Sequence, residues 1–236
     1  MALINKEDKL CDVIIIEPTV ISVLNRFNIF LGVGDKSVEQ ICEEKNLDVD
    51  FFLTILNTYM NAEYFPEKLL KSFDATLIVG YLTKTNKYYQ QFQIPNIERH
   101  FNLLIERSQD DNNNLSLLRK FFLEVKSELL GRIADDSNTW FKEIAELEKI
   151  DSGFCGTSGE ITVGQPAQAV DSIEDKLGDL ESMFIKHLTG SYDSNLCLAV
   201  LYAILSLKKD IIQNDRIRNR ILMPLYSFLL SKKRNE

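Results

Sequence analysis

The sequence predicts an all-α protein in which a small N-terminal helical domain is followed by an antiparallel four-helix bundle. Apolar residues recur at helical spacing along most of the 236-residue chain, whereas segments with the alternating pattern of β-strands are scarce. The hydrophobic content of 45% is enough for a chain of this length to bury a sizeable core.

Residues 1–68 are expected to form the small domain. Its predicted helices are Pro18–Phe27, Ser37–Lys45 and Val49–Met60. Gln40 follows Ser37 by three residues, which predicts a capping box at the start of the second helix. The glycine turn at residues 32–34 superficially resembles a phosphate loop, but it lacks the GKS or GKT ending, so a tight turn between helices is expected. Tyr64–Leu70 is predicted to link this domain to the next.

Residues 69–236 are expected to form the bundle, with four long helices after residue 73. A kink or break is predicted at Pro95, and polar loops at Gln109–Asn114 and Ile150–Pro166. The core-facing residues are expected to be mainly Leu118, Phe122, Val125, Leu129, Val170, Ile173, Leu177, Leu180, Phe184, Leu207, Ile211, Ile221 and Leu225.

Polar residues interrupt two of these apolar lines. Arg132 and Asp136 are four residues apart and continue the line of Leu129, while Asn214 and Arg218 are four apart on the last helix. A buried unpaired guanidinium would cost several kcal/mol. Either the arginine side chains extend to solvent, or the bundle contains a polar site.

Composition argues against several classes of function. A net charge of -8 opposes a groove for nucleic acid, and no apolar run is long enough to span a bilayer. Only His100 and His187 could supply imidazoles, fewer than a typical imidazole-based metal site uses. The four cysteines are far apart and residues 1–10 lack the apolar region of a secretory signal, so a reduced, cytoplasmic protein is expected. Cys155 is interpreted as a loop cysteine rather than a catalytic thiol.

The order of these segments resembles the hemerythrin-like repair-of-iron-centres family, in which a small helical domain precedes a four-helix bundle with a di-iron site. The similarity extends over nearly the whole chain. Residues 26–29 (RFNI), the glycine turn and residues 37–42 (SVEQIC) resemble the family's stretch that holds an adjacent cysteine pair. Residues 30–33 (FLGV) fill that turn here, so the cysteine pair that would support thiol chemistry is missing.

Four segments resemble the helices of the family's bundle, namely residues 85–98, 128–136, 173–180 and 210–225. The resemblance matches histidine ligands to five places in or near these segments and carboxylate ligands to two. The matched positions are Asn86, Arg107 or Ser108, Arg132, Asp136, Val170 or Asp171, Asn214 and Arg218.

The polar residues on the apolar lines therefore coincide with matched ligand positions. Among Arg132, Asp136, Asn214 and Arg218, only Asp136 has a side chain suited to such a metal, because hemerythrin-type iron needs imidazoles and carboxylates. Arginine cannot ligate, and its permanent charge repels a cation. The resemblance thus implies a hemerythrin-like fold with a degenerate di-iron site, for which no metal and no cofactor are expected.

The function predicted on this basis is that of a non-catalytic, stress-related or regulatory protein that binds a protein partner or a small ligand. The alternative is an iron-dependent protein that repairs iron–sulfur centres, or senses oxygen or nitric oxide, with its metal held in another way. DNA binding through the N-terminal helices is disfavoured, since that segment is not strongly basic and shows no recognition-helix pattern. Neither a nucleic acid nor a membrane is expected as partner, and the oligomeric state stays open.

Overall fold

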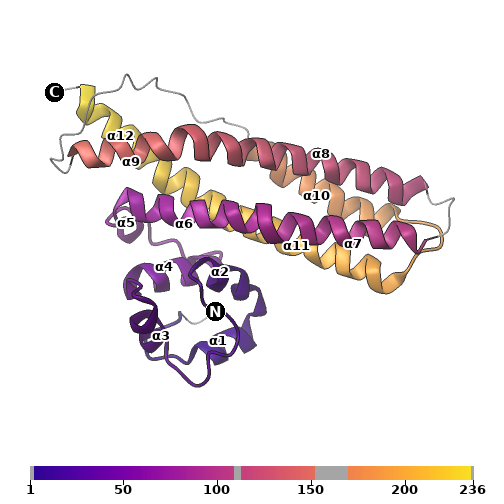
Figure 1. The fold of residues 1–236 in the computed structure, drawn as a ribbon, viewed down its shortest axis with the longest axis horizontal. Coiled ribbons are helices and arrows are strands. Elements are labelled where there is room, and N and C mark those ends of the chain that lie inside the picture. Colours follow the sequence, from indigo (N-terminus) through magenta and orange to yellow (C-terminus); the bar gives the residue numbers. More distant parts are fainter. Residues whose placement is uncertain (1–2, 109–112, 152–169, 235–236) are drawn as a thin grey trace. The chain divides into compact units, whose positions relative to one another are not determined.

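The computed structural model describes residues 3–108, 113–151 and 170–234, and the regular structure in these ranges is helical (Figure 1). Within them, the only β pairing is an isolated antiparallel bridge between Lys9 and Ser37. The all-α prediction is therefore confirmed. The loops expected at Gln109–Asn114 and Ile150–Pro166, with Cys155 in the second, lie mostly outside the described residues.

The elements in chain order are α1 (Leu10–Ile16), the 3₁₀ turn η1 (Pro18–Val20), α2 (Ile21–Arg26), α3 (Val38–Lys45), α4 (Val49–Met60), α5 (Glu67–Leu70), α6 (Ala75–Tyr88), η2 (Tyr89–Gln93), α7 (Ile94–Glu106), α8 (Asn113–Asp135), η3 (Asp136–Trp140), α9 (Phe141–Asp151), α10 (Val170–His187), α11 (Ser194–Ile217), η4 (Arg218–Leu222) and α12 (Met223–Arg234). The segments η2, η3 and η4 are π-helical, and each continues the helix before it.

The chain divides into two compact units. The first comprises Met1–Thr85 and Gln213–Glu236, and the second comprises Asn86–Ile212. Both boundaries fall inside helices, in α6 and in α11. This division differs from the domain boundary expected between residues 68 and 69. The expectation that residues 1–68 and 69–236 are separate domains stays a prediction.

The three helices predicted near the N-terminus are present in the first unit. The backbone N–H of Gln40 donates to Ser37 Oγ at 3.2 Å, and the N–H of Ser37 donates to Gln40 Oε1 at 3.0 Å, so the capping box is formed. Gly32 and Gly34 have φ angles of 94° and 63°, which shows why glycine is needed in the turn before α3. Helix α1 was not predicted, because its run of Val13 to Ile16 has low helix propensity.

Aromatic rings fill the core of the first unit. The ring of Phe27 contacts Phe52 edge-on at 5.0 Å and stacks on Tyr81 at 5.7 Å, both measured between centroids. The guanidinium of Arg26, which is 3% exposed, donates to Tyr81 Oη at 3.0 Å. Because Tyr81 lies on α6 and the others on or next to α2 and α4, these contacts connect α6 to the N-terminal helices.

In the second unit, helices α7, α8, α10 and α11 lie alongside one another (Figure 1). Buried apolar residues from all four helices form one core. Phe101 of α7 lies 5.4 Å from Phe122 of α8 and 5.6 Å from Phe184 of α10, between ring centroids. The core residues predicted here from helical spacing are buried, namely Leu118, Phe122, Val125, Leu129, Ile173, Leu177, Leu180, Phe184, Leu207 and Ile211. The side chain of Val170, also expected in this core, lies outside the described part.

Pro95 does not break the helix in which it lies. It is the second residue of α7, directly after the π-helical segment η2. Proline removes one backbone donor and crowds the preceding turn, and a π-helical turn is one way for a helix to continue past such a defect. The predicted disturbance at Pro95 is therefore a local change in hydrogen bonding, within a helical run from residue 75 to residue 106.

Candidate functional site

The apolar line along α8 ends in two charged side chains that are inside the protein. Arg132 is 7% exposed and Asp136 is 4% exposed, and they lie one turn apart after the buried Leu129. Of the two alternatives left open by the sequence, extension of Arg132 to solvent is therefore excluded. Burying an arginine or an aspartate costs several kcal/mol unless its charge is compensated nearby. The two positions are thus part of a polar site in the core.

Other polar side chains of the second unit are also buried, among them Glu143 and three that lie on the helical run of residues 75–106 or on α11. Asn86 and Gln93 are each 8% exposed, and Asp210 is 0% exposed. We call these three residues, with Arg132 and Asp136, the buried polar layer. Within the described residues, Asn86 Nδ2 and Gln93 Oε1 make no hydrogen bond, while Gln93 Nε2 donates to Ser206 Oγ at 3.5 Å.

Contacts between α7 and α8 indicate how the layer is assembled. Lys126 Nζ lies 2.7 Å from Glu98 Oε2, and Arg119 Nε donates to Asn102 Oδ1 at 3.0 Å, so the two helices run antiparallel. Arg132 is six residues beyond Lys126, and η2 lies the same number of residues before Glu98. At about 1.5 Å per residue, Arg132 is therefore level with η2, the segment that ends at Gln93.

The same comparison places Asp136 level with Tyr88 at the end of α6, two residues from Asn86 in the sequence. The hydrogen bond between Gln93 and Ser206 brings α11 to this level, and Asp210 lies one turn beyond Ser206. The layer thus combines one guanidinium, two carboxylates and two amides. Its chemistry is that of charge pairing and hydrogen bonding in a region of low dielectric constant.

A π-helical segment is next to the matched positions on three helices. The segment η3 begins at Asp136, η4 begins at Arg218, and η2 begins three residues after Asn86. Such segments insert one extra residue into a helical turn and occur frequently at functional sites. They support the interpretation that the backbone is specialised at each of these positions.

The remaining matched positions lie elsewhere in the chain. Asn214 and Arg218 belong to the first unit and are each 4% exposed, so Arg218 does not extend to solvent either. Arg218 Nη1 donates to the side-chain oxygen of Asn219 at 3.1 Å. Val170 is the first residue of α10. The structure therefore places Asn86, Arg132 and Asp136 in the second unit, and Asn214 and Arg218 in the first.

Asp210 and Gln93 were not identified as site residues from the sequence. A signal for Asp210 was present, because it follows Leu207 by three residues and precedes Asn214 by four, which places it on the same face of the helix. Gln93 gave no such signal, since its position depends on the π-helical turn in which it lies.

The side chains at the matched positions do not fit a di-iron centre. Such a centre needs several neutral imidazoles with bridging carboxylates, whereas Arg132 and Arg218 are buried permanent cations and Asn86 and Asn214 are amides. In the described parts of the chain, no three His, Cys, Asp or Glu side chains are grouped so that they could hold a metal ion.

The buried thiol of Cys42 lies in the stretch that resembles the family's cysteine-containing segment. Cys42 is 0% exposed, and burial, assisted by the charge of Asp48, raises the pKa of its thiol to about 11. The thiol is therefore protonated at neutral pH, when it is a poor nucleophile and a poor metal ligand.

This pKa predicts a loss of stability in alkaline solution. An unfolded thiol ionises near its ordinary pKa of 9.0, whereas the folded one retains its proton up to about pH 11. The unfolded state thus binds fewer protons across this interval, and stability falls as the pH rises. By pH 11 the parent should lose about 2 kcal/mol more than a Cys42→Ala variant. Urea unfolding of both proteins at pH 8, 9.5 and 11 measures this difference, and parallel curves would contradict it.

Comparisons of the chain with protein-family models, with curated proteins and with solved structures gave no match. Among the described helices, none combines the length and apolar character needed to cross a membrane.

Proposed function

We propose that the chain is a hemerythrin-like protein with a degenerate di-iron site, which acts as a non-catalytic, stress-related or regulatory binding protein. In this proposal α7, α8, α10 and α11 form an antiparallel four-helix bundle. Their shared apolar core and the antiparallel contacts between α7 and α8 support this arrangement. In the described residues the thiols of Cys11, Cys42 and Cys197 are free, which is in keeping with a reducing compartment such as the cytoplasm.

The observation that carries the proposal is the burial of Arg132 one turn before the buried Asp136. The resemblance matches Arg132 to a histidine ligand, and a guanidinium at that position repels a metal cation and cannot bind it. Carboxylates that would balance a metal can instead balance arginine. The protein would thus keep the polar layer of the family without its metal, which leaves binding of a protein partner or a small ligand as its activity.

Elemental analysis of the purified protein tests this proposal. The parent is expected to contain no stoichiometric iron, manganese or zinc, because the buried polar layer lacks the ligands and carries its own cation. A content of about two metal ions per chain, lost in an Asp136→Ala variant that remains folded, would overturn it. That result would favour the iron-dependent alternative, in repair of iron–sulfur centres or in sensing of oxygen or nitric oxide.

A further inference from the structure

Two arginines of the first unit lie against one aromatic ring. The guanidinium carbons of Arg220 and Arg216 are 4.1 Å and 4.8 Å from the centroid of the Phe65 ring. The arginines are one turn apart, at the end of α11 and in η4, and Phe65 precedes α5. Stacking on an aromatic face offsets part of the repulsion between two neighbouring cations. The ring of Phe65 therefore holds both guanidiniums in defined positions.

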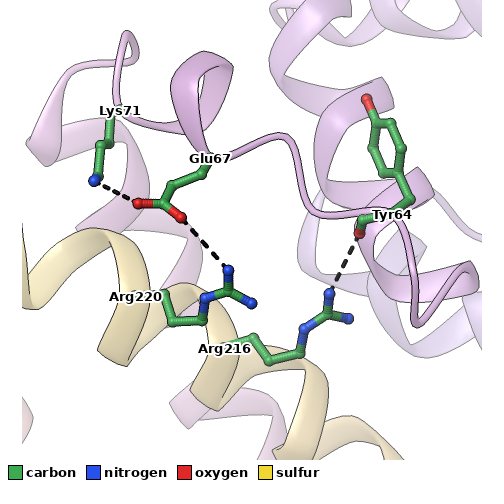
Figure 2. A network of polar contacts seen from close by, with 5 residues as sticks. All are labelled: Tyr64, Glu67, Lys71, Arg216 and Arg220. Atoms are coloured by element: carbon green, nitrogen blue, oxygen red, sulfur yellow. Dashed lines mark hydrogen bonds and ion pairs between the residues drawn. The ribbon is translucent and has the colours of Figure 1, made fainter.

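Within the described residues, the hydrogen bonds of Arg216 go to an amide oxygen and a carbonyl oxygen rather than to a carboxylate. It donates to Gln213 Oε1 at 2.7 Å and to the carbonyl oxygen of Tyr64 at 3.5 Å (Figure 2). Burial, and next the positive charge of Arg220, lower the pKa of Arg216, while the negative charge of Glu63 acts in the opposite direction. An additional anion near Arg216 would thus be stabilising.

Arg220 shares its carboxylate with a lysine. Figure 2 shows Glu67 between Arg220, whose Nη2 is 3.4 Å away, and Lys71, whose Nζ is 2.6 Å away. The shorter contact is to Lys71, and the side chain of Arg220 remains 53% exposed. Glu67 therefore has to balance both Lys71 and Arg220, while the neighbouring Arg216 adds a third cation, on a chain whose net charge is -8.

We propose that Arg216 and Arg220 form a binding site for the phosphate group of a small phosphorylated molecule. A guanidinium that stacks through its face keeps its N–H edge available for hydrogen bonds, and this planar edge matches the oxygens of a phosphate. A phosphate dianion would balance the excess positive charge beside Phe65. The site lies wholly within the first unit and does not depend on the proposed function.

Titration with inorganic phosphate and with glycerol phosphate tests the site, with arginine Nε–Hε signals observed by NMR spectroscopy. At constant ionic strength, saturable shifts of the Arg216 and Arg220 signals are expected at millimolar concentrations. An Arg216→Gln/Arg220→Gln variant should bind at least about tenfold more weakly. Phe65→Leu retains both charges but removes the ring, and it should weaken binding about threefold or more. Arg107→Gln, at an exposed arginine of the second unit, is the matched control and should bind as the parent does.

Equal affinities for the two probes would assign recognition to the phosphate group alone, and tighter binding of the ester would assign it to a phosphorylated molecule. Both results support the site. Binding should also weaken below about pH 6, where a phosphate monoester loses its second charge. Shifts that do not saturate, that chloride reproduces at equal ionic strength, or that persist in a folded Arg216→Gln/Arg220→Gln variant would overturn the proposal. If the Arg216→Gln/Arg220→Gln variant does not fold, the Phe65→Leu variant decides the question. Binding of phosphate by Phe65→Leu as tight as that of the parent would overturn the proposal.

Discussion

Replacement of Asp136 by alanine is expected to lower the free energy of unfolding by about 3–5 kcal/mol. Asp136 is 4% exposed and belongs to the buried polar layer, which holds the guanidinium of Arg132 and the carboxylates of Asp136 and Asp210. Removing one carboxylate leaves the charge of Arg132 undercompensated in the protein interior, where water cannot replace the lost partner. Urea unfolding of the parent and the variant at neutral pH measures the difference.

The neighbouring residue supplies a matched control. Asp135 carries the same side chain on the same helix but is exposed, so Asp135→Ala should change stability by less than about 0.5 kcal/mol. If Asp136→Ala were as mild as Asp135→Ala, the buried polar layer would not be a structural element, and these charges would behave as ordinary surface groups.

A second large effect is expected at Phe101, whose ring connects three helices of the second unit. Phe101 is 0% exposed and contacts Phe122 and Phe184. Phe101→Ala removes these contacts and leaves a cavity between helices, which should cost about 3–5 kcal/mol. Thermal and urea unfolding both report this loss.

Phe92 is the control for this substitution, because it lies on the same helical run but is 61% exposed. Phe92→Ala should change stability by less than about 0.5 kcal/mol. A double-mutant cycle between Phe101→Ala and Phe184→Ala should give a coupling energy of about 0.5–1.5 kcal/mol. Additive effects would show that α7 and α10 do not share a core in solution.

The helical core could be predicted because burial follows helical periodicity closely. Leu118, Phe122, Val125 and Leu129 are spaced by three or four residues, and all four are buried in α8. The π-helical segments could not be predicted, since a shift in backbone hydrogen bonding depends on tertiary packing rather than on local propensity. The assignment of residues 213–236 to the same unit as the N-terminal helices likewise depends on contacts between distant parts of the chain.

The candidate site was predictable in part because helical periodicity also indicates which polar residues face the core. The spacing of Arg132 and Asp136 after Leu129 placed them on the core-facing line, but whether a long arginine side chain reaches solvent depends on the neighbouring helices. The contacts of Arg216 and Arg220 with Phe65 had no signal in the sequence, because Phe65 lies in a segment that was expected to be a linker.

Incubation of the protein with iron(II) is the most direct test of whether Arg132 occupies the position of a metal ligand and prevents metal binding. The parent and an Asn86→His/Arg132→His variant are incubated anaerobically with Fe(II) and desalted, and iron is measured per folded chain. A metal-independent polar layer predicts substoichiometric iron in the parent. It predicts more iron in the variant, in which two imidazoles join Asp136 and Asp210 and the buried cation is gone. A parent that retains about two iron ions per chain, or as much iron as the variant, would contradict the metal-independent interpretation.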